Sequence, residues 1–131
     1  MTKGGLALVV DKWDARVENG DTLVEYAGRG LGIPDDDTEV PAEGSYVGTY
    51  KYKNGSLTGS GIATETFKGE GTTYYTWEEA SDFTENTYKY TGGTGIYEGV
   101  SGGGTYTNTY TYDIGPGTLQ GCKYKDKIVF P

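Results

Sequence analysis

The sequence contains no histidine, one cysteine, four prolines and one methionine. Without histidine, the chain cannot form a Ser-His-Asp or Cys-His nucleophilic system or a zinc site ligated by histidine. With Cys122 alone, it cannot form an internal disulfide or a cysteine-rich metal site. Because Cys122 lies in an apolar stretch, we interpret it as a buried small apolar residue rather than a reactive thiol. The sequence therefore predicts neither a metal site nor a cofactor.

Long apolar runs and positive charge are also scarce. The longest apolar run near the start, residues 6–10, is too short for a membrane span or for the core of a signal peptide. Eleven basic residues stand against 19 acidic ones, which gives a net charge of −8. A chain of this charge repels nucleic acid and anionic membranes, so we expect neither as a partner. The expected compartment is the cytoplasm by default, or outside the cell if a leader has been removed.

Glycine and tyrosine are abundant, with 23 and 13 copies. Glycine weakens helices and tyrosine favours a pleated surface, and no segment shows a sustained helical period. Asn19-Gly20 and Asn54-Gly55 are strong hairpin signals, and residues 113–117 form a third turn. We predict one all-β domain over residues 1–131, a closed antiparallel up-and-down barrel of about eight strands. The expected strands are residues 6–17, 22–31, 44–53, 56–67, 72–81, 85–91, 103–113 and 118–129.

The longest expected loop covers residues 32–44. It could cover the mouth of the barrel, or it could be solvated and mobile. The sequence leaves both alternatives open.

Alternation along the strands predicts which side chains face the interior. In the last strand Lys123, Lys125 and Lys127 share one side, while Cys122, Tyr124, Asp126, Ile128 and Phe130 share the other. In the first strand Lys12, Asp14 and Arg16 oppose Val9, Asp11, Trp13 and Val17. Five strands have one face rich in aromatics, which we expect to be the interior. Residues 56–67 are ambiguous, because Ile62 and Phe67 fall on opposite sides.

An interior rich in tyrosine allows two interpretations. An eight-stranded barrel is just wide enough to be filled by side chains or to hold one small ligand. The tyrosines could fill it and hydrogen-bond to one another, or they could line a pocket for a small molecule. For the second case, the expected ligand-binding residues are Trp13, Tyr50, Trp77, Asn86, Tyr88, Asn108, Tyr110 and Tyr124.

Asp11 and Asp126 are the candidate catalytic residues. Alternation along their strands predicts that both side chains face the interior. Closure of the barrel would also bring the first and last strands side by side. Two carboxylates in one partly apolar cavity would raise the pKa of at least one of them, which would make it a general acid. Alternatively, one or both lie at a rim in water, or pair with a lysine.

One segment resembles a known family. Thr91-Gly92-Gly93-Thr94-Gly95-Ile96-Tyr97-Glu98-Gly99-Val100-Ser101-Gly102, preceded by Glu85-Asn86-Thr87-Tyr88, resembles the glycine-rich signature of allene oxide cyclase-like barrels, a calycin-like fold. Plant cyclases and small bacterial proteins carry this signature, and bacterial spirotetronate-forming cyclases are similar in size and barrel type. A nucleotide site is excluded, because no glycine follows Gly95 three residues on.

The resemblance implies a cofactor-free apolar cavity in which a reactive epoxide or polyene closes a ring. In the plant enzymes a glutamate of the first strand, with an asparagine two residues on, helps to open the epoxide. Asp11 and Trp13 stand at these two places. Ile96, Tyr97 and Val100 are expected to plug one end of the barrel. The family also implies a homo-oligomer, a dimer or a trimer, that buries some outward aromatic residues.

Three functions follow from these patterns. The first is a cofactor-independent cyclase or isomerase that acts on a hydrophobic small molecule inside the barrel. The second is a binding protein of the same shape that leaves such a molecule unchanged. The third is a structural or secreted barrel with a tyrosine-filled interior.

Overall fold

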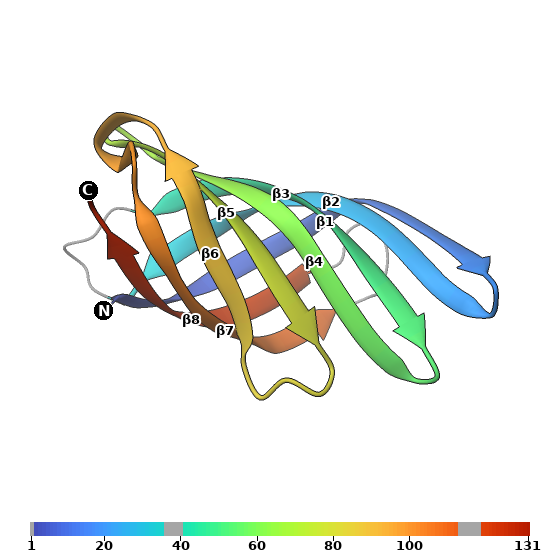
Figure 1. The fold of residues 1–131 in the computed structure, drawn as a ribbon. Helices are drawn as coiled ribbons and strands as arrows, with labels where there is room; N and C mark the ends of the chain where they lie inside the picture. The colour runs from blue at the N-terminus through green and yellow to red at the C-terminus, as the bar shows by residue number, and fades with distance from the viewer. Residues whose placement is uncertain (1, 36–40, 113–118) are drawn as a thin grey trace.

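The computed structural model describes residues 2–35, 41–112 and 119–131, without the side chains of residues 2, 3, 109–112, 119 and 120. Eight antiparallel strands follow one another around a ring, and β1 pairs with β8, so that the sheet closes (Figure 1). The described residues contain one further element, the short 3-10 helix η1 (Gly95–Tyr97). The predicted all-β fold of about eight sequential strands is confirmed. The strands are β1 (Thr2–Glu18), β2 (Asp21–Pro34), β3 (Ala42–Lys53), β4 (Ser56–Phe67), β5 (Gly71–Ala80), β6 (Asn86–Gly93), β7 (Ser101–Tyr112) and β8 (Leu119–Val129).

The two predicted Asn-Gly hairpin turns are confirmed. Both residues of each turn have positive φ, 53° and 82° at Asn19-Gly20 and 51° and 79° at Asn54-Gly55. This is the conformation of a type I′ turn, whose twist matches that of the flanking strands. Both hairpins project at the end of the ring opposite the two chain termini (Figure 1). The third expected turn, at residues 113–117, lies outside the described residues.

The connection between β2 and β3 is shorter than predicted. The strands extend to Pro34 and begin again at Ala42, so the flanks of the expected loop at residues 32–44 belong to the sheet. Cross-strand pairing explains the difference, since Gly32 still pairs with Ala42. Most of the remaining connection lies outside the described residues, and its expected role as a cover stays a prediction.

A β-bulge in β1 changes which of its side chains face inward. The pairing with β2 shifts between Val10 and Lys12, so that Asp11 is an extra residue in the strand. Val10 is buried at 3% exposure, whereas Asp11 is exposed and accepts a hydrogen bond from Arg29 Nε at 3.2 Å. The predicted inward orientation of Asp11 is therefore wrong. Simple alternation fails here because the bulge reverses parity, and Trp13 beyond it faces the interior as expected.

The main hydrophobic core lies inside the ring, where small residues of β4 make room for an indole. Val10, Val24, Tyr26, Ala63 and Trp77 form this buried cluster. A Cβ atom on Gly61 would overlap the ring of Trp77 and the carbonyl oxygen of Val47. The ambiguity of β4 is thereby resolved: its glycine and alanine side faces inward, and Ile62 is the outward residue at 59% exposure.

The glycine-rich segment after β6 packs against the end of the ring near the chain termini. Tyr97 and Val100 are buried at 8% and 4% and form a second cluster with Tyr90, as predicted. Ile96 is 56% exposed, so its expected part in the plug is wrong. Gly95 has φ of 62° and lies directly against the Glu70 carbonyl, a position that only glycine fills without strain.

The packing of Trp77 predicts a cost for any side chain at Gly61. We expect Gly61→Ala to lower the free energy of unfolding by about 1–3 kcal/mol, because the added methyl must displace a buried ring or backbone. Denaturant unfolding followed by tryptophan fluorescence measures the change. Ser60→Ala, at the exposed neighbouring position, is the control and should change stability by less than about 0.5 kcal/mol. Equal midpoints for Gly61→Ala and the wild type would contradict this packing.

Candidate functional site: a tyrosine-walled cavity with buried carboxyl groups

The ring encloses a cavity of about 370 Å³. This volume lies within the range of small-molecule sites. Apolar side chains on its wall include Leu6, Leu8, Phe67 and Trp77. The remaining wall is mostly phenol rings, contributed by Tyr26, Tyr46, Tyr50, Tyr75, Tyr88, Tyr90, Tyr97, Tyr106 and Tyr124.

Four carboxyl groups also reach the cavity wall, and each accepts a hydrogen bond from tyrosine. Tyr75 donates to Glu65 at 3.0 Å, Tyr97 donates to Glu70 at 2.6 Å, and Tyr50 donates to Glu79 at 2.8 Å. Asp126 accepts from two hydroxyls, those of Tyr88 at 2.6 Å and Tyr90 at 2.8 Å. A buried tyrosine hydroxyl needs an acceptor, and the carboxylates supply it from the wall itself.

Asp126, one of the two predicted catalytic residues, is buried at 9% exposure. Burial raises the pKa of its carboxyl group above the ordinary value, while the two tyrosine hydrogen bonds and the positive chain terminus act in the opposite direction. Its predicted inward orientation is confirmed. Its partners are tyrosines, so neither the rim nor the lysine alternative describes it.

Glu65 lines the same cavity as Asp126 and is the second acid whose pKa is raised. Burial raises its pKa, the hydrogen bond from Tyr75 lowers it, and the charge of Asp126 raises it again. The charge of Asp126 therefore acts on Glu65 within the cavity. A pair of carboxyl groups in an apolar cavity was expected from Asp11 and Asp126, but Glu65 takes the place of Asp11.

The hydroxyl and thiol groups of the wall hold their protons. Burial raises the pKa of Tyr46 to about 12, and its hydroxyl donates to the Val9 carbonyl at 3.0 Å. Burial raises the pKa of the Cys122 thiol to about 12, and this thiol donates to Asn108 Oδ1 at 3.2 Å. Cys122 is thus the buried, protonated thiol that the sequence predicted.

The structure brings most of the predicted ligand-binding residues together. Tyr50, Trp77, Tyr88, Asn108 and Tyr124 line the cavity with Asp126. Trp13 instead packs on Tyr26 and Tyr50, with ring centroids 5.9 and 6.3 Å away, and does not line it.

Two further predicted residues lie apart from this group. Asn86 begins β6, pairs with Tyr106 and does not line the cavity, so its placement there is wrong. The side chain of Tyr110 lies outside the described residues.

Two acids of the wall, Glu65 and Glu70, were missed from the sequence, and a third, Glu79, was not among the predicted site residues. The inward orientation of Glu79 follows from alternation, because it lies two residues after the inward Trp77 on the same strand. Glu65 shares the side of Phe67, but Ile62 made the parity of that strand ambiguous. Glu70 lies in the turn between β4 and β5, where alternation gives no signal.

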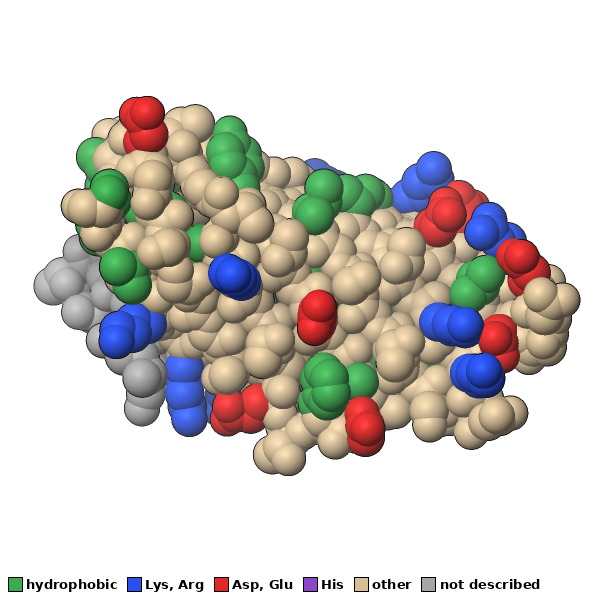
Figure 2. Space-filling model, viewed as in Figure 1, with side chains coloured by type: hydrophobic (Ala, Val, Ile, Leu, Met, Phe, Trp, Pro, Cys, Tyr) green, Lys and Arg blue, Asp and Glu red, His purple; other side chains and the backbone are tan. Residues whose placement is uncertain are grey.

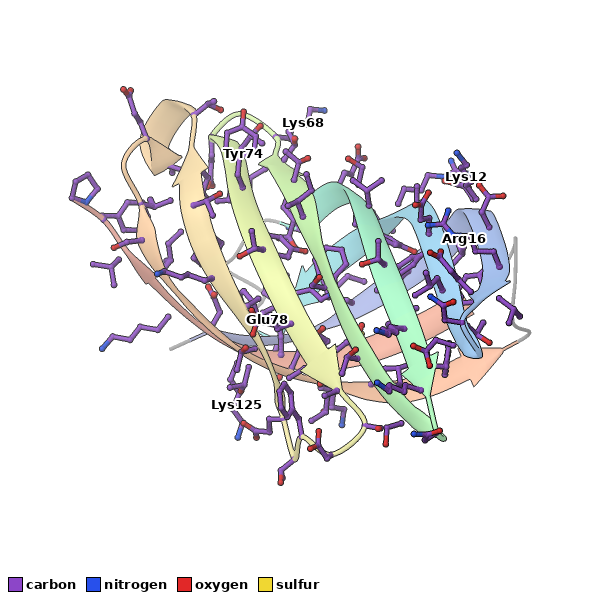
Figure 3. The ribbon with its side chains drawn as sticks, turned by 45° about the vertical axis from the view of Figure 1, so that its right-hand side comes forward. Lys12, Arg16, Lys68, Tyr74, Glu78 and Lys125 are labelled. Carbon is purple, nitrogen blue, oxygen red and sulfur yellow. The ribbon has the colours of Figure 1, made fainter. Side chains whose placement is uncertain are left out.

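No lysine or arginine stands on the described part of the cavity wall. Every basic side chain that the structure describes is exposed. Acidic and basic side chains are spread over the outer face, and the labelled Lys12, Arg16 and Lys125 point away from the interior (Figures 2 and 3). Within the described residues, no group of three or more His, Cys, Asp or Glu could hold a metal ion.

None of the helical turns in the described part of the chain has the length and apolar character needed to cross a bilayer. Comparisons with protein-family models, curated proteins and solved structures find no match to this chain.

The raised pKa of Glu65 predicts how stability changes with pH. The folded state holds the proton more tightly than the unfolded state, so this stabilisation is present below the ordinary pKa and is lost as pH rises through the folded pKa. Glu65→Gln cannot ionise. We therefore expect its free energy of unfolding to fall less between about pH 4 and pH 8 than that of the wild type.

Urea unfolding at several pH values measures this difference. Glu78→Gln, on the exposed side of β5, is the matched control and should keep the wild-type pH dependence. If Glu65→Gln loses as much stability as the wild type over this interval, Glu65 is not a buried acid.

Proposed function

We propose that this protein binds a hydrophobic small molecule inside the ring. The observation that carries the proposal is the cavity of about 370 Å³, walled by tyrosine rings and a few polar groups. Binding sites for small molecules combine an apolar wall with a small number of placed polar side chains in this way. No cofactor and no nucleic acid enters the proposal.

The hydrogen bonds of the tyrosines favour a pocket over a filled interior. The hydroxyls of Tyr75, Tyr88 and Tyr90 end on Glu65 and Asp126 rather than on one another. The phenol rings of these three tyrosines therefore lie along the cavity wall. Stacking of Tyr26 on Tyr50, with centroids 4.6 Å apart, fills the end near the hairpins, where Trp13 also packs.

We also propose that the ring is a barrel of the calycin-like, allene oxide cyclase-like type. Its eight sequential strands and the plug-forming Tyr97 and Val100 support this assignment. The acid that stands at the family's glutamate, Asp11, faces solvent, so any catalysis in this chain depends on other carboxyl groups. Self-association into a dimer or trimer stays a prediction.

Native mass spectrometry and dye binding test the proposal. We expect the purified protein either to carry an extractable apolar ligand or to bind the neutral dye Nile red at one site, with quenching of Trp77. Gly32 lines the cavity, and its Cβ would lie 3.9 Å from Glu65 Oε2. Gly32→Leu should therefore obstruct the cavity, because the added side chain occupies space that the dye needs. We expect it to weaken dye binding at least tenfold.

Leu31→Ala is the control, because Leu31 is the neighbouring residue on the outer face, at 48% exposure. It should bind dye as the wild type does, and circular dichroism should show both variants folded. An empty protein that also fails to bind Nile red would favour the tyrosine-filled interior and end the binding proposal.

A second candidate function is a cofactor-independent cyclase or isomerase. The observation that favours it is Asp126, a buried carboxyl group with a raised pKa that faces an aromatic cavity. Such a group can protonate an epoxide oxygen, and the wall can hold the opened chain folded for ring closure. The proton then returns from the cyclised product to Asp126, so that no other reactant is consumed.

Turnover of an apolar allylic epoxide, with products separated by gas chromatography, tests this activity. We expect Asp126→Asn to slow turnover by about 10²–10⁴-fold and to retain Nile red binding, because only the proton donor is lost. Asp11→Asn, on the outer face, should leave both intact. Wild-type turnover in Asp126→Asn would overturn the acid role, and absence of turnover in the wild type would leave a binding protein.

A further inference from the structure

The charge of the cavity wall is unbalanced. Glu65, Glu70, Glu79 and Asp126 contribute carboxyl groups, and the described part of the wall contributes no lysine or arginine. The described salt bridges all involve side chains on the outside, and none includes any of these four acids. Buried acids are ordinarily paired with a basic side chain, so four acids without a described lysine or arginine partner are a feature that needs an explanation.

The tyrosines only partly stabilise these acids. A phenol hydroxyl donates one hydrogen bond to a carboxylate but brings no positive charge. Burial still outweighs these hydrogen bonds at Glu65 and Asp126, where the pKa is raised. Each of the two groups is therefore stabilised further by a proton or by a positive charge placed in the cavity.

The rings between these two acids are also suited to a cation. Tyr75, Tyr88 and Tyr90 have centroids 5.6 to 6.2 Å apart and interplanar angles of 60° to 89°. Because the rings are steeply inclined to one another, they present faces as well as edges within the same small region. Phenol faces attract ammonium groups, and aromatic walls of this kind recognise alkylated amines.

We propose that the ligand of the cavity is an organic cation, an amine with an apolar body. This inference rests on the proposed binding function and names its ligand class. The ammonium group lies between Glu65 and Asp126 among the tyrosine rings, and the apolar body extends along Leu6, Leu8 and Phe67. A hard metal ion fits less well, since it requires a shell of about six oxygen ligands rather than phenol faces.

Binding of such a cation is coupled to proton release. An ammonium group favours the ionised forms of Glu65 and Asp126, so both carboxyl groups lose protons as it enters. The released protons come from Glu65 and Asp126, whose pKa values are raised by burial, since the phenols and the thiol hold their protons. The chain's amino terminus acts on Asp126. The other titratable side chains of the cavity wall are Tyr26, Tyr46, Tyr50, Tyr75, Tyr88, Tyr90, Tyr97, Tyr106, Tyr124, Glu70, Glu79 and Cys122.

A matched series of probes tests the inference. Decylamine, decanol and decanoate share one apolar chain and carry a positive, a zero and a negative head group. Each is titrated into the full chain by calorimetry, below the concentration at which it forms micelles. We expect decylamine to bind at least tenfold more tightly than decanol, and decanoate to bind most weakly near neutral pH.

The dependence on pH and buffer gives a second readout. The affinity for decylamine should rise from about pH 5 to pH 8, and its binding heat should vary with the ionisation enthalpy of the buffer, because protons are released. The affinity for decanol should stay constant. Decanoate should bind more tightly as pH falls.

Single substitutions connect the selectivity to the two acids. Glu65→Gln and Asp126→Asn should each reduce the affinity for decylamine at least tenfold and leave decanol binding within a factor of about two. Glu78→Gln, on the outer face of β5, should change neither affinity. Its side chain lies outside the ring (Figure 3).

The outcomes separate this inference from the function on which it rests. If decanol binds but decylamine binds no more tightly, or if Glu65→Gln and Asp126→Asn leave decylamine binding unchanged, the cationic ligand class is wrong and the apolar pocket stands. If none of the three probes binds, the binding function itself is wrong.

Discussion

The interior of this protein depends on one pairing, a tyrosine hydroxyl that donates to a buried carboxyl group. Tyrosine supplies most of the large side chains inside the ring, and each buried hydroxyl needs an acceptor. Glu65, Glu79 and Asp126 provide acceptors on the same wall. The rings are thereby held against the sheet, and the space along the axis stays open. A leucine core would instead collapse into that space, since nothing would hold it to the wall.

This arrangement also explains the charge distribution of the chain. The acids that accept tyrosine hydrogen bonds face inward, while Lys123, Lys125 and Lys127 of β8, which flank Tyr124 and Asp126, are exposed. The outer face carries both signs of charge (Figure 2). The cavity wall carries four acids, and within the part of the chain that the structure describes, no lysine or arginine faces these acids.

Most of the fold could be predicted from the sequence, and part of the site could not. The Asn-Gly turns and the alternation of tyrosine with lysine fixed the strands within a few residues. Alternation also placed Asp126, Tyr88 and Tyr124 correctly. It failed at Asp11, where a bulge adds one residue, and at Glu65, where an exposed Ile62 obscured the parity. Pairing register determines both positions, and register depends on the neighbouring strand rather than on the local sequence.

The bulge in β1 has a consequence for how the gene tolerates change. Val10 faces inward, Asp11 is the extra residue, and Lys12 and Trp13 resume the outward and inward positions. Removal of the codon for Asp11 would leave the remaining residues of the strand on their present faces. Removal of a single codon away from the bulge, such as that for Ala15, would exchange inside for outside along the rest of the strand. The bulge is thus the part of this strand that can lose one residue while the flanking side chains keep their inward and outward orientations.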